Sequence, residues 1–141
     1  MRALHADTGY LLYRLGLRSG SMFNAVLAEH GFRLRHYALM RYLAAVEGAG
    51  QRELSEKLGY DPSAIVSLVD DLQELGFAER RPLPGDRRHR IVVLTEKGHA
   101  ALRETDTASR RVTEDLVAPL NADERATLHA LLLRAAEPGM D

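Results

Sequence analysis

The residues with the clearest chemical potential are arginines that crowd one short segment of the chain. Residues 77–97 contain six cations and three anions, which gives a local charge of +3 in a chain whose formal net charge is −1. Guanidinium groups bind phosphate, and they can enter a narrow minor groove, where negative potential is concentrated. Arg87, Arg88 and Arg90 fall at or beside the tip of a predicted hairpin, and Asp86 is spaced to orient the Arg88 guanidinium. The segment therefore indicates a nucleic-acid contact, and an exposed turn that only carries charge is the alternative.

A helix, a tight turn and a second helix precede this segment. We predict the helices over Arg52–Leu58 and Pro62–Leu75. Gly59 can adopt the left-handed conformation that ends the first helix. Asp61 can accept hydrogen bonds from free N–H groups of the second helix, and Pro62 fits its first turn.

The second of these helices has two distinct faces. Its predicted buried stripe consists of Ile65, Leu68, Val69 and Leu72, and its opposite face shows Ser63, Val66 and Ser67. Short side chains near a helix N-terminus allow the helix to lie deep in a major groove. A helical hairpin packed in a core has the same pattern, so this feature alone leaves DNA binding open.

Longer helices are expected on either side. Apolar periodicity predicts helices over Thr8–Glu29 and Leu34–Glu47, a helix that Thr95 caps and that runs to about Ala118, and a last helix after Pro119-Leu120-Asn121. Strands over Phe77–Pro82 and Arg90–Leu94 form the hairpin, joined by Leu83–His89. The fold class we predict is mainly α with a small β-hairpin (α+β). The terminal helices carry apolar stripes that a small core cannot cover, so we expect a homodimer.

Composition excludes several kinds of site. The chain has 141 residues, 45% hydrophobic and 28% charged, which indicates one globular domain. The absence of cysteine excludes disulfides, thiolate zinc sites and thiol-based redox sensing. The six histidines show no pairing at helical spacing, so we expect no metal site and no cofactor. Neither a signal peptide nor a membrane span is apparent, so we expect a cytoplasmic protein.

The order of several short motifs carries a family resemblance. Glu53-Leu54-Ser55-Glu56-Lys57-Leu58-Gly59 is followed by Val69-Asp70-Asp71-Leu72-Gln73-Glu74-Leu75-Gly76-Phe77-Ala78-Glu79-Arg80-Arg81, then by Pro84-Gly85-Asp86-Arg87-Arg88 and by Leu94-Thr95-Glu96-Lys97-Gly98. Each motif is weak, and the ordered set is specific. Over nearly its whole length, the chain resembles the MarR family of winged helix-turn-helix transcriptional regulators.

This resemblance implies an architecture and a set of DNA contacts. Residues 1–141 would form a single domain, with about 1–30 and 96–141 as dimerisation helices and about 34–95 as the DNA-binding lobe. The dimer would place two recognition helices in the major groove of a pseudo-palindromic operator and would repress transcription. Carried over by position, the DNA-binding residues are Pro62, Ser63, Val66, Ser67, Asp86, Arg87, Arg88 and Arg90, with Arg88 entering the minor groove.

The resemblance also implies that a phenolic or aromatic carboxylate ligand could release the operator. We expect such a ligand near Tyr10, Tyr13, Arg14, His36, Tyr37 and Met40, where an arginine lies beside tyrosine and histidine. Ordinary packing roles for these residues are the alternative.

Two other functions remain to be weighed against a repressor. A winged-helix module that contacts only proteins would show no salt-dependent affinity for duplex DNA. An enzyme is disfavoured, because we find no catalytic residues: no nucleophile–base pair, phosphate-binding glycine loop or metal-ligand cluster.

Overall fold

A computed structural model describes residues 3–137 of the chain. Over these residues it contains a short 3-10 helix, six α-helices and one two-stranded hairpin, in the order η1 (Leu4–Ala6), α1 (Thr8–Ala28), α2 (Leu34–Val46), α3 (Gln51–Leu58), α4 (Pro62–Glu74), β1 (Ala78–Leu83), β2 (Asp86–Leu94), α5 (Glu96–Leu116) and α6 (Ala122–Ala136). The predicted fold class, mainly α with one β-hairpin, is confirmed. The first two and last four residues of the predicted domain lie outside the described range.

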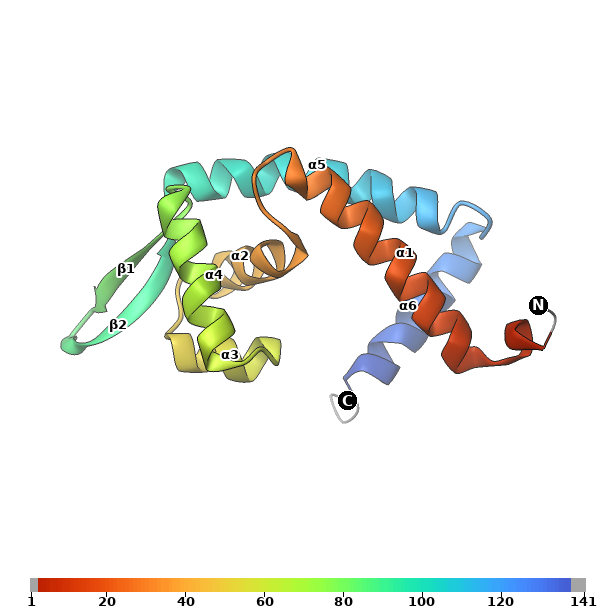
Figure 1. The fold of residues 1–141 in the computed structure, drawn as a ribbon, viewed down its shortest axis with the longest axis horizontal. Helices are drawn as coiled ribbons and strands as arrows, with labels where there is room; N and C mark the ends of the chain where they lie inside the picture. The colour runs from red at the N-terminus through yellow and green to blue at the C-terminus, as the bar shows by residue number, and fades with distance from the viewer. Residues whose placement is uncertain (1–2, 138–141) are drawn as a thin grey trace.

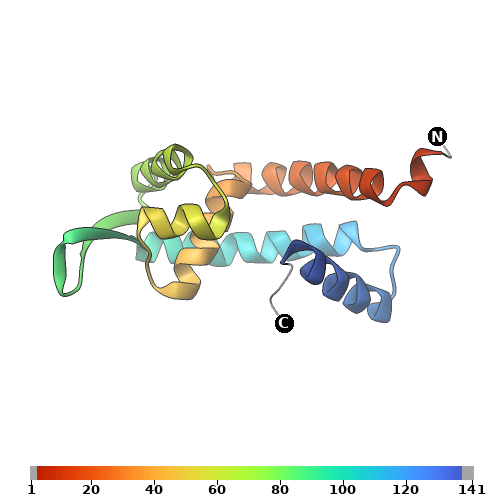
Figure 2. The ribbon, with the colours of Figure 1, turned by 90° about the horizontal axis from the view of Figure 1, so that it is seen from below.

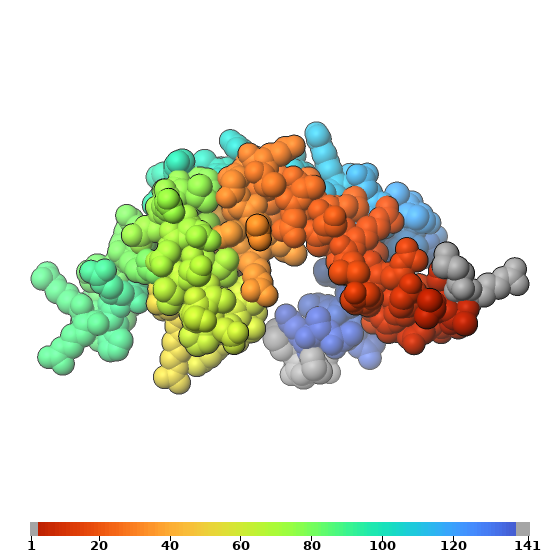
Figure 3. Space-filling model, in the orientation of Figure 1, coloured from red at the N-terminus to blue at the C-terminus, as the bar shows by residue number. Residues whose placement is uncertain are grey.

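The molecule has the shape of an arch (Figure 1). Helices α2, α3 and α4 and the hairpin form a lobe at one end, and α5 spans the top. Helix α1 runs beside α5, as the view from below shows (Figure 2), and descends to the other end, where α6 lies. A space-filling view shows a hollow under the arch, between the lobe and α6 (Figure 3).

Local sequence signals account for most helix ends. The Asp7 carboxylate accepts a hydrogen bond from Tyr10 N, and Thr95 Oγ1 accepts one from Gly98 N, as predicted for the start of α5. These bonds satisfy N–H groups that have no partner within the helix. Glu47 ends α2 in the left-handed conformation, with φ 60°.

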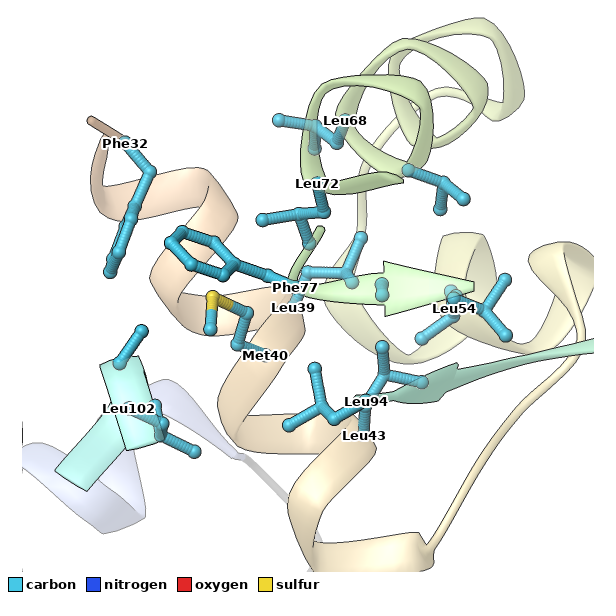
Figure 4. Packing of buried hydrophobic residues seen from close by; sticks show 14 of the residues in the cluster. Phe32, Leu39, Met40, Leu43, Leu54, Leu68, Leu72, Phe77, Leu94 and Leu102 are labelled. Carbon is cyan, nitrogen blue, oxygen red and sulfur yellow. The ribbon is translucent and has the colours of Figure 1, made fainter. Parts of the chain in front are cut away.

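The core lies inside the lobe and is closed by the first half of α5. It joins Leu39, Met40 and Leu43 of α2 to side chains of α3, α4 and the hairpin root (Figure 4). The rings of Phe32 and Phe77 meet edge to face with their centroids 5.8 Å apart. Every residue of the predicted α4 stripe is buried, which fixes the rotation of that helix.

The hairpin is longer than the sequence predicted. Its strands are antiparallel and reverse over Pro84-Gly85, so Asp86 through His89 belong to β2 and not to the joining turn. Gly85 has φ +84°, which lets the chain reverse within two residues and extends pairing toward the tip. Ala49 adds an isolated bridge to Val92 at the hairpin root, with N···O distances of 3.0 and 2.8 Å. The tip therefore continues from a ladder that begins in the core, with a register shift between Pro82 and Leu83.

Candidate nucleic-acid interface

Helix α4 begins at a turn held by backbone hydrogen bonds and by one serine hydroxyl. Gly59 is left-handed with φ +67°, as predicted, and its N–H donates to the Ser55 carbonyl. Ser55 Oγ donates to the Tyr60 carbonyl at 2.6 Å. Pro62 occupies the first turn as predicted, but the Asp61 side chain makes no capping hydrogen bond, so that expectation was wrong. Asp61 contributes its backbone carbonyl instead, which accepts from Ile65 N.

The face of α4 opposite the core is exposed. Ser63, Val66 and Ser67 lie on it, as the periodicity predicted, and Pro62 is exposed beside them. A shallow groove of about 480 Å³ runs between this face and α3, and it is lined by Gln51, Arg52, Ser55, Glu56, Pro62 and Val66. The structure thus presents short side chains on a helix whose rotation the core has fixed.

The hairpin presents its cations at the far end. The root residues Val92, Val93 and Leu94 are buried, whereas Arg87, Arg88 and Arg90 are exposed. Within residues 3–137 the structure shows no ion pair or hydrogen bond for the guanidinium groups of these three arginines. They are therefore available to phosphates or to a groove.

Asp86 plays a different part from the one that sequence spacing suggested. Its Oδ1 accepts a hydrogen bond from the Arg88 backbone N–H at 3.0 Å, and its Oδ2 accepts one from His89 Nδ1 at 2.7 Å. These bonds, the one from His89 foremost, lower the pKa of the Asp86 carboxyl. The prediction that Asp86 holds the Arg88 guanidinium was wrong: within residues 3–137 the Asp86 carboxylate bonds the Arg88 backbone and His89, and no hydrogen bond or ion pair joins it to the guanidinium. Asp86 shapes the backbone at the tip.

Arg80 is a residue whose role the sequence did not reveal. From β1 its guanidinium reaches α4, with Nη2 2.7 Å from Asp70 Oδ1 and Nη1 donating to Gln73 Oε1 at 3.1 Å. Its Nε donates to Gln51 Oε1 of α3 at 3.0 Å. Arg81 is paired with Glu79 on the same strand. Among the arginines of residues 77–97, Arg80 is therefore the one that connects the hairpin to both helices of the helix-turn-helix.

The terminal helices expose most of their apolar residues. In η1 and α1 the exposed large apolar side chains are Leu4, Leu11, Leu12, Tyr13, Leu15 and Leu17, and in α6 they are Leu131, Leu132 and Leu133. In the described chain, Leu27 is the buried residue of α1, and α6 has none. Two helices with so little burial of their own need another surface to cover them.

The six predicted ligand residues do not come together within one chain. Tyr10, Tyr13 and Arg14 lie in the first half of α1, at the opposite end of the arch from the lobe (Figure 1). Met40 is fully buried in the core (Figure 4). A single crevice lined by all six is therefore absent from residues 3–137.

His36 is occupied by contacts inside the lobe. Its Nδ1 accepts a hydrogen bond from the Arg33 N–H at 2.9 Å, so its proton lies on Nε2, which donates to Asp71 Oδ2 of α4 at 2.8 Å. Both ring nitrogens are used, and the side chain is buried. His36 fastens α2 to α4.

Tyr37 lines a pocket that includes none of the other five predicted ligand residues. Its hydroxyl donates to Asp106 Oδ1 at 2.7 Å, and Arg41 Nη1 donates to both Asp106 oxygens at 3.1 Å. Burial and the bond to Asp106 raise the pKa of Tyr37. The pocket has a volume of about 400 Å³ and lies between α1, α2 and α5, lined by Phe23, Tyr37, Arg41, Asp106, Ser109, Arg110 and Thr113. Ser109 Oγ is buried there beside the Tyr37 hydroxyl, and within residues 3–137 no partner meets the usual hydrogen-bond geometry.

The described residues lack the features of two other kinds of site. Residues 3–137 contain no group of three or more His, Asp or Glu side chains placed to hold a metal ion. No helix within this range is both long and apolar enough to cross a membrane.

Comparison with known proteins connects this geometry to characterised relatives. A family model described as "MarR family" matches residues 30–89. A putative transcriptional regulatory protein for the hcr operon of Thauera aromatica is 35% identical over 98 residues, which is 70% of this chain and 59% of that protein. The transcriptional repressor NicR of Pseudomonas putida is 29% identical over 126 residues, 89% of this chain and 80% of NicR.

Solved structures match over almost the whole chain. CouR from Rhodococcus jostii RHA1, bound to p-coumaroyl-CoA, superposes with a TM-score of 0.85 at 29% identity, covering 100% of this chain and 99% of CouR. A mutant of MarR from E. coli, in complex with operator DNA, superposes with a TM-score of 0.81 at 25% identity, covering 92% of this chain and 93% of that MarR chain.

Proposed function

The chain belongs to the MarR family of transcriptional regulators, and from that premise we propose that it is a dimeric repressor that binds a pseudo-palindromic operator and releases it when a small molecule binds. The observation that carries the proposal is the joint exposure of the short-side-chain face of α4 and of the hairpin-tip arginines, whose guanidinium groups have no partner within residues 3–137. The two surfaces belong to one lobe, in which Arg80 joins the hairpin to α3 and α4.

The DNA contacts follow from this arrangement. Pro62, Ser63, Val66 and Ser67 would lie in the major groove, where the N-terminal residues of a recognition helix meet base edges. Arg88 would enter the adjacent minor groove, with Asp86 shaping the tip, and Arg87 and Arg90 would neutralise phosphates. These arginines supply local positive charge that the net charge of −1 does not.

A second copy of the chain would cover the exposed leucines of α1 and α6. A twofold dimer places two recognition helices about 34–36 Å apart, one turn of DNA, so a pseudo-palindromic site matches its symmetry. Sedimentation should therefore give twice the mass of the chain, and replacing Leu131 and Leu132 by Glu should produce monomers.

The ligand would occupy the pocket between α1, α2 and α5. Phe23 and Tyr37 offer aromatic surface, and Arg110 and the Ser109 hydroxyl can bind a carboxylate, whereas Arg41 is already bonded to Asp106. A small aromatic acid fits this combination. The pocket lies between α2 of the lobe and the long helices α1 and α5. A bound ligand could therefore change the orientation of the lobe, and with it the angle between the two recognition helices of a dimer.

The test is a fluorescence-anisotropy titration of duplex DNA from the region upstream of the chain's own gene. At about 50 mM salt we expect saturable binding of one dimer per site, and at about 200 mM we expect affinity to fall roughly tenfold or more, because bound phosphates release counterions. Equal affinity for unrelated duplexes would remove sequence specificity from the proposal. Failure to bind any duplex at low salt would overturn it in favour of a winged-helix module that contacts proteins.

A further inference from the structure

Val66 is an apolar side chain placed where the recognition surface is otherwise polar or short. It is 40% exposed, whereas Ile65, Leu68, Val69 and Leu72 of the same helix are at most 8% exposed. Val66 is the fifth residue of α4 and follows Pro62 by four residues, so the two side chains share one side of the helix. Val66 therefore points away from the apolar core of the lobe and remains exposed.

The surroundings of Val66 restrict what it can meet. It lines the groove between α3 and α4 together with Gln51, Arg52, Ser55 and Glu56. Arg52 Nε donates to Glu56 Oε1 at 3.0 Å, so the rim of the groove carries paired charge. The exposed leucines of α1 and α6 lie at the other end of the arch, so covering them leaves Val66 exposed (Figure 1).

The major groove offers one apolar feature to such a side chain, the 5-methyl group of thymine. The other base-edge groups there are hydrogen-bond donors and acceptors, which a valine cannot satisfy. Ser63 and Ser67 flank Val66 on the exposed face and are short enough to let it approach the base edge. An exposed valine at this position therefore matches a thymine methyl better than any other base group.

We propose that Val66 is a specificity-determining residue that packs against a thymine 5-methyl in each operator half-site. This inference rests on the proposed repressor function and adds the identity of a base. It requires a T·A pair at one defined position of each half-site, whatever the arginines of the hairpin contact. Removal of that single methyl, with every hydrogen-bonding group kept, should weaken binding.

The experiment uses the full chain and a duplex selected by it from a randomised pool. Each thymine of the selected site is replaced in turn by deoxyuridine, which lacks only the methyl group. For the wild-type protein we expect one position per half-site where this replacement raises Kd about fourfold, the value for one buried carbon. In Val66→Ala the same replacement should have no effect, because the methyl has lost its partner.

A matched control separates this contact from a general loss of apolar surface. Leu83 is 37% exposed on the hairpin, which would lie over the minor groove, where thymine carries no methyl. Leu83→Ala should therefore keep the full response to deoxyuridine. The inference is overturned if the wild-type protein binds the selected duplex but no deoxyuridine weakens it, or if Val66→Ala retains the response. If the wild-type protein selects no duplex at all, the repressor function itself fails, and this inference fails with it.

Discussion

The Asp70 carboxylate of α4 and the Arg80 guanidinium of β1 lie 2.7 Å apart and join the recognition helix to the hairpin. Arg80 also donates to Gln73 and Gln51, so one side chain connects the two DNA-contacting surfaces. Asp70 is more than half exposed, so solvent screens the pair and its contribution to stability is modest. Its importance lies in the geometry it imposes.

Arg80→Ala should therefore weaken DNA binding more than it weakens the fold. We expect a loss of stability of about 1 kcal/mol or less, which is a few degrees in Tm. The measurement pairs thermal unfolding with anisotropy for Arg80→Ala, Asp70→Asn and the double variant. Coupled residues should give non-additive effects on Kd. Simple additivity would show that the ion pair does not position the hairpin.

Arg88→Ala tests the hairpin tip. Its guanidinium has no partner within residues 3–137, so its loss should leave Tm within about 1 °C, as for other surface substitutions. The Kd for operator DNA should rise roughly tenfold or more, and the dependence of binding on salt should become shallower by up to about two charges per dimer, one for each Arg88. Arg81→Ala is the matched control, because Arg81 is already paired with Glu79. A drop of several degrees in Arg88→Ala would show a structural role instead.

The pocket between α1, α2 and α5 can be tested through release of DNA. Hydroxylated aromatic acids such as p-coumarate and 4-hydroxybenzoate are titrated against the protein–DNA complex. Arg110→Ala removes a lining cation and should raise the concentration needed for release, while Arg103→Ala, on the same helix but outside the pocket, should not. Equal responses from the two variants would move the ligand elsewhere.

Gly98 tests the junction between the hairpin and α5. A Cβ added there would lie 2.0 Å from the Phe77 carbonyl oxygen, and that oxygen accepts the hydrogen bond from Thr95 N. Neither backbone can move without breaking the start of α5, so Gly98→Ala should cost about 3 kcal/mol or more. Denaturant unfolding measures this loss. Gly50→Ser, whose Cβ has no contact nearer than 3.9 Å, should leave stability nearly unchanged. Similar stabilities for the two variants would show that the junction tolerates a side chain.

The bonds at the hairpin tip predict a pH dependence for Asp86. Hydrogen bonds from His89 and from the Arg88 N–H stabilise the ionised carboxylate, so the Asp86 pKa lies below its usual value of 3.8. A lowered pKa means that these bonds contribute above pH 3.8 and are lost as the pH falls through the folded-state value. An NMR titration of the carboxyl group should give a midpoint below 3.8, and His89→Ala should move the midpoint upward. An unshifted midpoint in the wild-type protein would show that the tip is open in solution.

Sequence patterns were sufficient to predict the α-helices of this fold and the place of the hairpin, but not the length of the hairpin. The α4 stripe of Ile65, Leu68, Val69 and Leu72, the left-handed Gly59 and the Thr95 cap were all correctly predicted, because periodicity, a positive φ and a cap depend on neighbouring residues. The charge of residues 77–97 was likewise visible, and it directed attention to the hairpin tip.

Only the tertiary structure decided which side chains act together. Arg80 and Arg81 look equivalent in the sequence. Packing of β1 against α4 nevertheless brings Arg80 into an ion pair with Asp70 and leaves Arg81 on the surface, paired with Glu79. The sequence pattern placed His36 and Met40 near a ligand, but His36 is bonded to Asp71 and Met40 is buried in the core. The pocket is lined instead by Arg41 of α2 and by Ser109 and Arg110 of α5. The physical reason is that local patterns determine how a helix or strand forms and which face is apolar. Contacts between residues distant in the chain depend instead on how those faces rotate and pack together.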